Sequence, residues 1–210
     1  MKVLFIGNSH TFFNDMAYQF AELMRAAGQA VDVTMLSRGG QKVCEHIKNE
    51  QTRFNILYGG YDYVILQENT TEFPDGETHA KNAAVIKEWC DKAGAKLGLY
   101  MNFESPKGTP KLDYLREGLL FAAEKLQLPV ARVGEAFAKA KETLPQIDLH
   151  FTDRHHANAV GSYLIAMVIA HDLFGVDVTG LPNVITYTDE TVVSVPAEDA
   201  AALQALVQGL

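Results

Sequence analysis

The sequence has few of the features that mark specialised classes of protein. Its 210 residues include only two cysteines, Cys44 and Cys90, too isolated to need a disulfide framework, and we expect both to be buried free thiols. The 18 Lys and Arg residues form no run, and 26 Asp and Glu residues give a net charge of −8. We therefore expect neither nucleic acid nor an anionic membrane surface as a partner, because both need clustered positive charge.

Long apolar runs are also missing. The longest, from 163 to 170, is too short to cross a bilayer. Only four apolar residues follow Lys2, fewer than the roughly 7–15 of a secretory signal, so we expect a cytoplasmic protein. No repeat, low-complexity segment or linker interrupts the chain. Residues 1–210 are therefore expected to form one domain, with 181–210 as a C-terminal extension packed on it.

What the chain does have is an alternation of short apolar runs with amphipathic stretches. Strands separated by helices indicate right-handed crossovers and a parallel sheet covered on both faces. The tail departs from this alternation, with a strand and then a helix that starts at Pro196. The strands are predicted at 2–6, 31–36, 63–66, 96–102, 130–133 and 184–187, and the helices at 15–27, 41–55, 77–93, 110–126, 134–143 and 158–174.

Two polar segments, far apart in the chain, carry the groups of a serine hydrolase. The first strand runs directly into Gly7-Asn8-Ser9, which puts Ser9 at a carboxyl end of the sheet, where open α/β folds keep their ligand sites. Asp153 and His156 are three residues apart, a spacing that lets a carboxylate orient an imidazole. Ser9 is therefore the candidate nucleophile, His156 its base and Asp153 the group that orients the base.

These segments belong to a set of four that resembles the SGNH (GDSL-type) hydrolases. The matching blocks are Gly7-Asn8-Ser9, Gly39-Gly40, Gln67-Glu68-Asn69 and Asp153-x-x-His156 followed by Asn158 and Gly161. They stand in the family's order, although the first has Asn where Asp is usual. The resemblance implies a three-layer α/β/α sandwich with a flavodoxin-like sheet of strand order 2-1-3-4-5. It also implies an esterase that forms an acyl-enzyme on Ser9, with no cofactor and no metal.

The resemblance further implies an oxyanion hole. Its donors would be the backbone N–H groups of Ser9 and Gly40 and the side-chain amide of Asn69. Gly40 is preferred to Gly39 because it stands last before the helix. The third block lacks the family's usual glycine, so this loop could turn differently and give the role to Gln67 instead.

Each of these residues also has a purely structural interpretation. Ser9 could cap the first helix, and Asp153 could cap the helix that begins near Asn158. His10 lies on the nucleophile loop, where it could line the pocket. His171 falls on an apolar helix face and is expected in the core.

The same residues bear on four other functions. A dinucleotide site would need GxGxxG, and an α/β-hydrolase elbow a second glycine after the serine; both are missing. A metal hydrolase could use His150, Asp153, His155 and His156, but no HExxH motif or second ligand cluster accompanies them. A non-catalytic carbohydrate-binding module would follow if the triad had decayed, yet every required side chain is present.

The substrate is only coarsely indicated. Phe12, Phe13, Phe103 and Glu104 are candidates to line the site, and no long apolar lid accompanies them. This favours small-molecule esters with short or acetyl chains, such as O-acetylated carbohydrates. Lysophospholipids and thioesters are the alternatives on the same fold. Nothing in the sequence indicates the oligomeric state.

Overall fold

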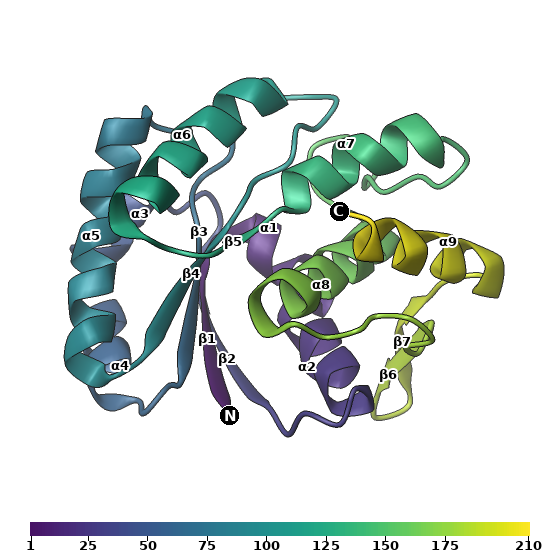
Figure 1. Cartoon of the computed structure of the whole chain (residues 1–210), viewed down its shortest axis with the longest axis horizontal. Coiled ribbons are helices and arrows are strands. Elements are labelled where there is room, and N and C mark those ends of the chain that lie inside the picture. Colours follow the sequence, from purple (N-terminus) through teal and green to yellow (C-terminus); the bar gives the residue numbers. More distant parts are fainter.

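The computed structural model describes every residue, from Met1 to Leu210, and its centre is a five-stranded parallel sheet (Figure 1). The strand order is β2-β1-β3-β4-β5, with helices on both faces, which confirms the predicted fold class. All neighbouring strands pair in parallel. The strands are β1 (Lys2–Gly7), β2 (Asp32–Ser37), β3 (Tyr63–Gln67), β4 (Lys96–Tyr100) and β5 (Val130–Ala131).

The helices divide into two layers because the strands alternate their apolar side chains between the two faces. In β1, Val3 and Phe5 join one core, whereas Leu4 and Ile6 join the other. The first core lies under α2 (Met16–Ala26), α7 (Val133–Thr143), α8 (Ala159–Phe174) and α9 (Ala197–Gln208). The second lies under α3 (Val43–His46), α4 (Glu50–Tyr58), α5 (Gly76–Ala93) and α6 (Leu112–Leu126).

The largest differences from the sequence prediction lie in two stretches. The single helix expected at 41–55 is two helices, α3 and α4, because the side chain of Asn49 accepts from the N–H of Gln51 (2.8 Å) and starts a new helix there. In the tail, β6 (Val184–Tyr187) pairs with an unpredicted strand, β7 (Glu190–Ser194). Their turn contains Thr188 at φ 52°, without the glycine or asparagine that usually announces such a turn.

The C-terminal tail packs against the first layer. Ile185 and Val193 of the hairpin, and Leu203 and Val207 of α9, are buried in the same core as α8. Pro196 is the N-cap of α9. The division of the chain into one domain and an extension stays a prediction. No helix in the structure has both the length and the apolar character that crossing a bilayer demands.

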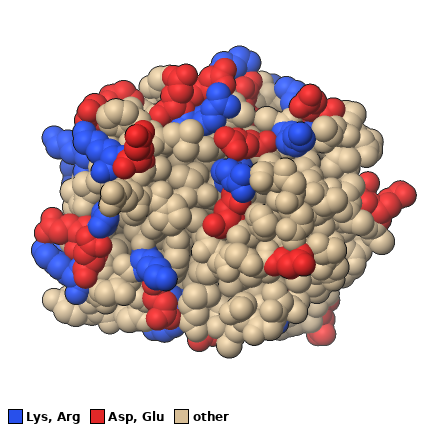
Figure 2. Space-filling view, in the orientation of Figure 1, with Lys and Arg blue, Asp and Glu red and all other residues tan.

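The two cysteines differ in burial, and the surface charges are mixed. Cys90 is buried, as predicted, and burial raises the pKa of its thiol to about 12. The prediction was wrong for Cys44, which is only half-buried. On the face drawn in Figure 2, Lys and Arg side chains lie among Asp and Glu side chains and form no large basic patch.

Candidate active site

The turn after β1 is built so that only glycine and a helix-capping residue fit. A Cβ atom on Gly7 would lie 2.3 Å from Oγ1 of Thr11 and 2.5 Å from Oε1 of Gln67. Asn8 is the N-cap of α1 (Ser9–Phe12), and its side chain accepts from the N–H of His10 (3.1 Å). The interpretation of Ser9 as the cap was therefore wrong, and the Ser9 hydroxyl is not occupied by capping. As the first residue of α1, Ser9 also has an N–H without an intrahelical partner.

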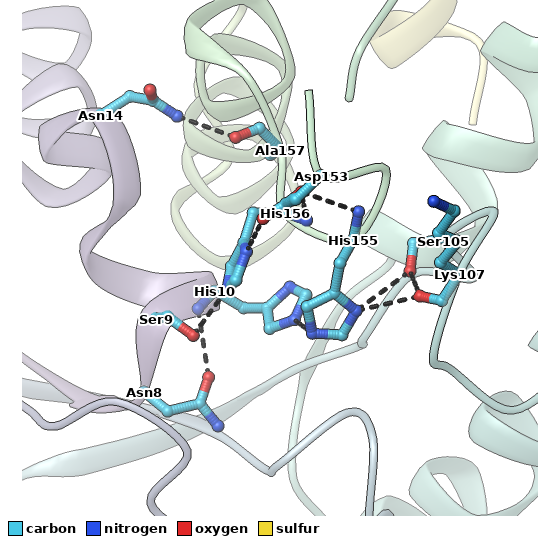
Figure 3. Close-up of polar contacts among 10 residues, drawn as sticks. All are labelled: Asn8, Ser9, His10, Asn14, Ser105, Lys107, Asp153, His155, His156 and Ala157. Carbon is cyan, nitrogen blue, oxygen red and sulfur yellow. Dashed lines mark hydrogen bonds and ion pairs between the residues drawn. The ribbon is translucent and has the colours of Figure 1, made fainter. Parts of the chain in front are cut away.

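The structure brings Ser9, His156 and Asp153 together in one chain of hydrogen bonds (Figure 3). Oγ of Ser9 lies 2.8 Å from Nε2 of His156, and Nδ1 of the same ring lies 2.6 Å from Oδ2 of Asp153. Because a carboxylate only accepts, Nδ1 carries the proton and Nε2 is free to accept from the serine. This is the arrangement in which an imidazole can take the proton of a serine hydroxyl.

The acid and base come from a short turn before α8. Oδ1 of Asp153 accepts from the backbone N–H groups of His155 (2.9 Å) and His156 (3.0 Å). Burial alone would raise the pKa of this carboxyl, but the hydrogen bonds from the His156 ring and from both N–H groups hold its pKa well below the usual value. Asp153 does not cap α8, as the alternative interpretation had it. That cap is Asn158, which accepts from the N–H of Gly161 (2.8 Å).

A link from the nucleophile segment holds this turn in place. The residues between α1 and α2 form a 3₁₀ turn (Phe13–Asp15), in which Asn14 and Asp15 both have positive φ, at 52° and 51°. The amide of Asn14 donates to the carbonyl of Ala157 (3.0 Å) and to Oγ of Ser162 (2.9 Å). These bonds join the segment that carries Ser9 directly to the segment that carries His156, in addition to the contacts that both segments make with the sheet.

Aromatic side chains fix the plane of the base. The ring of Phe13 stacks on His156 with centroids 4.1 Å apart and an interplanar angle of 6°. Phe151, partly exposed, packs edge-on against Phe13 at 5.7 Å. Phe103 does not line the site as predicted, because it is buried and stacked on Phe137 at 4.0 Å. The sequence could not separate these phenylalanines, since Phe13 and Phe103 both lie in segments between a predicted strand and a predicted helix.

Two further histidines lie beside the base. His10 is buried, with Nε2 3.2 Å from Nε2 of His155, while Nδ1 of His155 lies 3.0 Å from the carbonyl of Lys107. Burial, and the nearby rings of His155 and His156, lower the pKa of His10 to about 3, so this imidazole is neutral at physiological pH. Candidate ligand atoms of His10, His155 and His156 all lie within 4.8 Å of one another.

This grouping differs from the set of possible metal ligands in the sequence, which was His150, Asp153, His155 and His156. His150 does not join it; its Nδ1 faces Asp148 at 3.9 Å, and its Nε2 is buried without a partner. His171 is half-buried at the end of α8, with Nδ1 3.1 Å from the carbonyl of Val176, and so is not the core residue expected.

The loop after β2 is tied to the nucleophile turn by Asn8 and to the loop after β3 by Asn69. Gly40 has φ 70°, a conformation that favours glycine, and its carbonyl accepts from the side-chain amide of Asn69 (2.7 Å). The side-chain amide of Asn8 donates to the next carbonyl, that of Gln41 (3.0 Å). Oδ1 of Asn69 accepts from the N–H of Glu72 (2.9 Å), which fixes the orientation of the amide. One N–H of the Asn69 amide remains for another acceptor.

Gln67 has a different position from Asn69. Its side chain is buried under the nucleophile turn, where Oε1 accepts from the N–H of Asn8 (3.0 Å) and from Oγ1 of Thr11 (3.0 Å). Its amide nitrogen donates to the carbonyl of Glu68. Gln67 therefore joins β3 to the turn that carries Ser9.

Glu68 is a buried carboxylate that sequence reasoning missed. Its Oε1 accepts from the N–H of Val43 (3.0 Å) at the start of α3 and from the N–H of Asn69 (2.7 Å). Oε2 lies 3.6 Å from Nδ1 of His79, which is also buried. One side chain thus holds the loop of Asn69 against the helix that follows Gly40. A charged residue just after a strand is usually an exposed loop residue, so nothing in the local sequence indicated that Glu68 is buried.

Two adjoining cavities border the site on the His155 side, through Ser105 and Arg154. Their volumes are 350 and 190 Å³, and Glu104, predicted to line the site, lines the smaller one. Glu104 accepts from the N–H of Leu112 (3.0 Å) and from Lys111. A larger cavity of 640 Å³ lies along α4 and includes none of the candidate site residues. The two bordering cavities share Pro106, Phe137, Lys141 and His150.

Comparison with known proteins finds this fold in solved structures of hydrolases. No family model matches the sequence, and no curated protein matches it. A solved structure of a candidate SGNH hydrolase from Slackia heliotrinireducens is 26% identical, with a TM-score of 0.68 over 82% of this chain and 98% of that chain. A catalytic mutant of an acetylxylan esterase from Geobacillus stearothermophilus is 16% identical, with a TM-score of 0.64 over 82% and 93%. A DUF4886 family protein from Bacteroides uniformis is 14% identical, with a TM-score of 0.78 over 100% and 93%.

Proposed function

We propose that this chain, which belongs to the SGNH (GDSL-type) hydrolase family, is a serine esterase in which Ser9 is the nucleophile, His156 the general base and Asp153 the residue that orients the base. The observation that carries the proposal is the continuous pair of hydrogen bonds, 2.8 Å from Ser9 to His156 and 2.6 Å from His156 to Asp153. A serine is activated when a base lies within hydrogen-bond reach of its hydroxyl and a third group orients that base.

The reaction has two steps that use the same groups. Oγ of Ser9 bonds to the ester carbonyl carbon while its proton moves to Nε2 of His156. When the tetrahedral intermediate collapses, the ester C–O bond breaks, and the departing alcohol takes that proton and leaves an acyl group on Ser9. Water then attacks the acyl group with His156 again as base, which releases the acid and restores the serine. Asp153 stabilises the imidazolium in both steps.

We assign the oxyanion hole to the N–H groups of Ser9 and Gly40 and the side-chain amide of Asn69. Three observations support this set: the hydrogen bond from Asn69 to the Gly40 carbonyl (2.7 Å), the fixed orientation of the Asn69 amide, and its remaining N–H. Gln67 is the weaker candidate, because its side chain is buried and bonded to Asn8 and Thr11. Each such donor is worth about 2.7–4 kcal/mol of the barrier in a well-studied serine hydrolase.

We propose acetyl or other short-chain esters of polar alcohols, such as O-acetylated carbohydrate, as substrates. The two cavities beside the site have mixed linings, in which the charged groups of Glu104, Lys141 and Arg154 lie among apolar side chains such as Phe137. Such a lining suits a short acyl group on a polar alcohol. The structural likeness to an acetylxylan esterase agrees with this substrate class.

The test is a chain-length series. Hydrolysis of p-nitrophenyl esters from acetate upward, run beside acetylated oligosaccharides, should be fastest for acetyl groups, with Ser9→Ala as the inactive control. Rates that rise steadily with chain length would favour the lysophospholipase or thioesterase alternatives. The absence of any Ser9-dependent hydrolysis would contradict the esterase proposal itself.

A further inference from the structure

Three imidazoles meet beside Ser9, although the proposed reaction uses only one of them. Their candidate ligand atoms lie within 4.8 Å of one another, and the two Nε2 atoms of His10 and His155 are only 3.2 Å apart (Figure 3). The edge of a tetrahedron around a zinc ion with histidine ligands is about 3.3 Å, as follows from Zn–N bonds of about 2.0–2.1 Å. The Nε2 atoms of His10 and His155 are therefore about as far apart as two nitrogen ligands of one zinc ion.

In two of the three rings, one nitrogen donates a hydrogen bond, which leaves the lone pair of the other nitrogen to bind a metal. Nδ1 of His156 donates to Asp153 (2.6 Å), and Nδ1 of His155 donates to the carbonyl of Lys107 (3.0 Å). Each ring therefore presents the lone pair of Nε2, and each has the outer hydrogen bond that histidine ligands of metals usually make. His10 has no such partner at Nδ1, so its proton must move from Nε2 to Nδ1 when a metal binds.

The surroundings of the cluster allow an ion to enter. His155 and His156 are half-buried, and only His10 lies fully inside. Arg154, the neighbouring cation, is paired with Asp148 at 2.8 Å. Three imidazole nitrogens suit zinc, copper or nickel, whereas magnesium and calcium need oxygen ligands.

We propose that His10, His155 and His156 form a binding site for a divalent transition metal such as zinc, and that metal bound there switches hydrolysis off reversibly. Nε2 of His156 offers one lone pair, which the hydroxyl of Ser9 and the metal cannot share. A bound ion therefore removes the base from its serine. The inhibitory half of this proposal rests on the proposed esterase function, but the binding half does not.

The test is calorimetric titration of the full, untagged chain with zinc chloride, beside hydrolysis of p-nitrophenyl acetate at the same zinc concentrations. We expect one zinc per chain, loss of hydrolysis in step with occupancy, recovery with a chelator, and no binding of magnesium chloride. Ser9→Ala should still bind zinc, because its three rings are intact. His155→Ala should bind it about 100-fold more weakly or worse, since even outer-shell partners of metal ligands are worth roughly 10–100-fold.

His150→Ala is the matched control, because His150 lies nearby but outside the cluster. It should bind zinc as the wild type does, and thermal unfolding should show that both histidine variants are folded. Unchanged affinity in His155→Ala, an equal loss in His150→Ala, or no binding to the wild type would overturn the site. Hydrolysis that rises with zinc would overturn the inhibitory role. Zinc binding by a chain that hydrolyses no ester would refute only the esterase.

Discussion

The two halves of the proposed site are built in opposite ways. The half that carries the nucleophile and the oxyanion donors is held by deeply buried supports: Asn8 and Gln67 are each 1% exposed, and Glu68 is 2% exposed. The half that carries the acid and base is a surface turn, in which the side chain of Asp153 is 39% exposed. Groups that stabilise developing charge must be held rigidly before the reaction, which buried hydrogen bonds achieve. We infer that the buried half sets both stability and rate, whereas the exposed half sets mainly the rate.

The largest expected effect comes from the nucleophile. Ser9→Ala should lower kcat by about 10⁶, as loss of the serine does in a comparable triad, and a fluorophosphonate should label the wild type at Ser9 but not the variant. Because one small hydroxyl is removed at the first residue of α1, the unfolding temperature should stay the same. Retained hydrolysis in the variant would contradict the proposed mechanism.

The exposed half is tested by Asp153→Asn. The amide can still accept from the backbone, but its NH₂ group facing Nδ1 favours the wrong tautomer of His156, so kcat should fall by about 10⁴. Because this carboxylate is exposed to solvent, which screens its bond to His156, urea unfolding should show a loss of stability that is small beside the loss of activity. Parallel losses of stability and activity would show that the acid-base turn also supports the fold.

The buried half is tested by a pair of amide variants. Asn69→Ala should lower kcat by about 10²–10³ with little change in KM, because an oxyanion donor acts mainly in the transition state. Gln67→Ala leaves the N–H of Asn8 without its partner in a buried place, so it should cost about 1–3 kcal/mol of unfolding free energy. The reverse pattern, with kcat lost mainly in Gln67→Ala, would transfer the oxyanion role to Gln67.

The smallest effect on kcat is expected at Glu68. Glu68→Ala strands two buried N–H groups, those of Val43 and Asn69, and should cost about 1–3 kcal/mol of unfolding free energy for each, with a smaller fall in kcat than Asn69→Ala. Glu68→Gln retains an oxygen that can accept from both groups, so it should recover most of both losses. Equal losses in the two variants, in urea unfolding and in steady-state kinetics, would show that this position needs the charge and not only the acceptor.

The parts of the molecule that sequence could predict are those with a local or periodic signal. The sheet followed from apolar runs such as Val3–Ile6, and the pairing of Asp153 with His156 followed from their three-residue spacing. The structure brings these two residues to Ser9 as expected, while their catalytic roles stay proposals.

What sequence could not supply are contacts between distant segments that leave no pattern in either one. The meeting of His10 with His155, the buried position of Glu68 and the stacking of Phe103 on Phe137 are of this kind. The choice between Gln67 and Asn69 also depended on which side chain lies under the turn, which spacing does not reveal.

The hydrogen bonds that join Asn14 to the segment of the base affect how the protein loses activity on storage. Two successive left-handed residues are costly unless something holds them, and here the bonds from Asn14 to Ala157 and Ser162 do so. If those bonds open, the strained turn relaxes, and the nucleophile segment loses its tie to the base in the same event. Inactivation on storage would then begin as a small, reversible loosening of this junction, well before the sheet itself gives way.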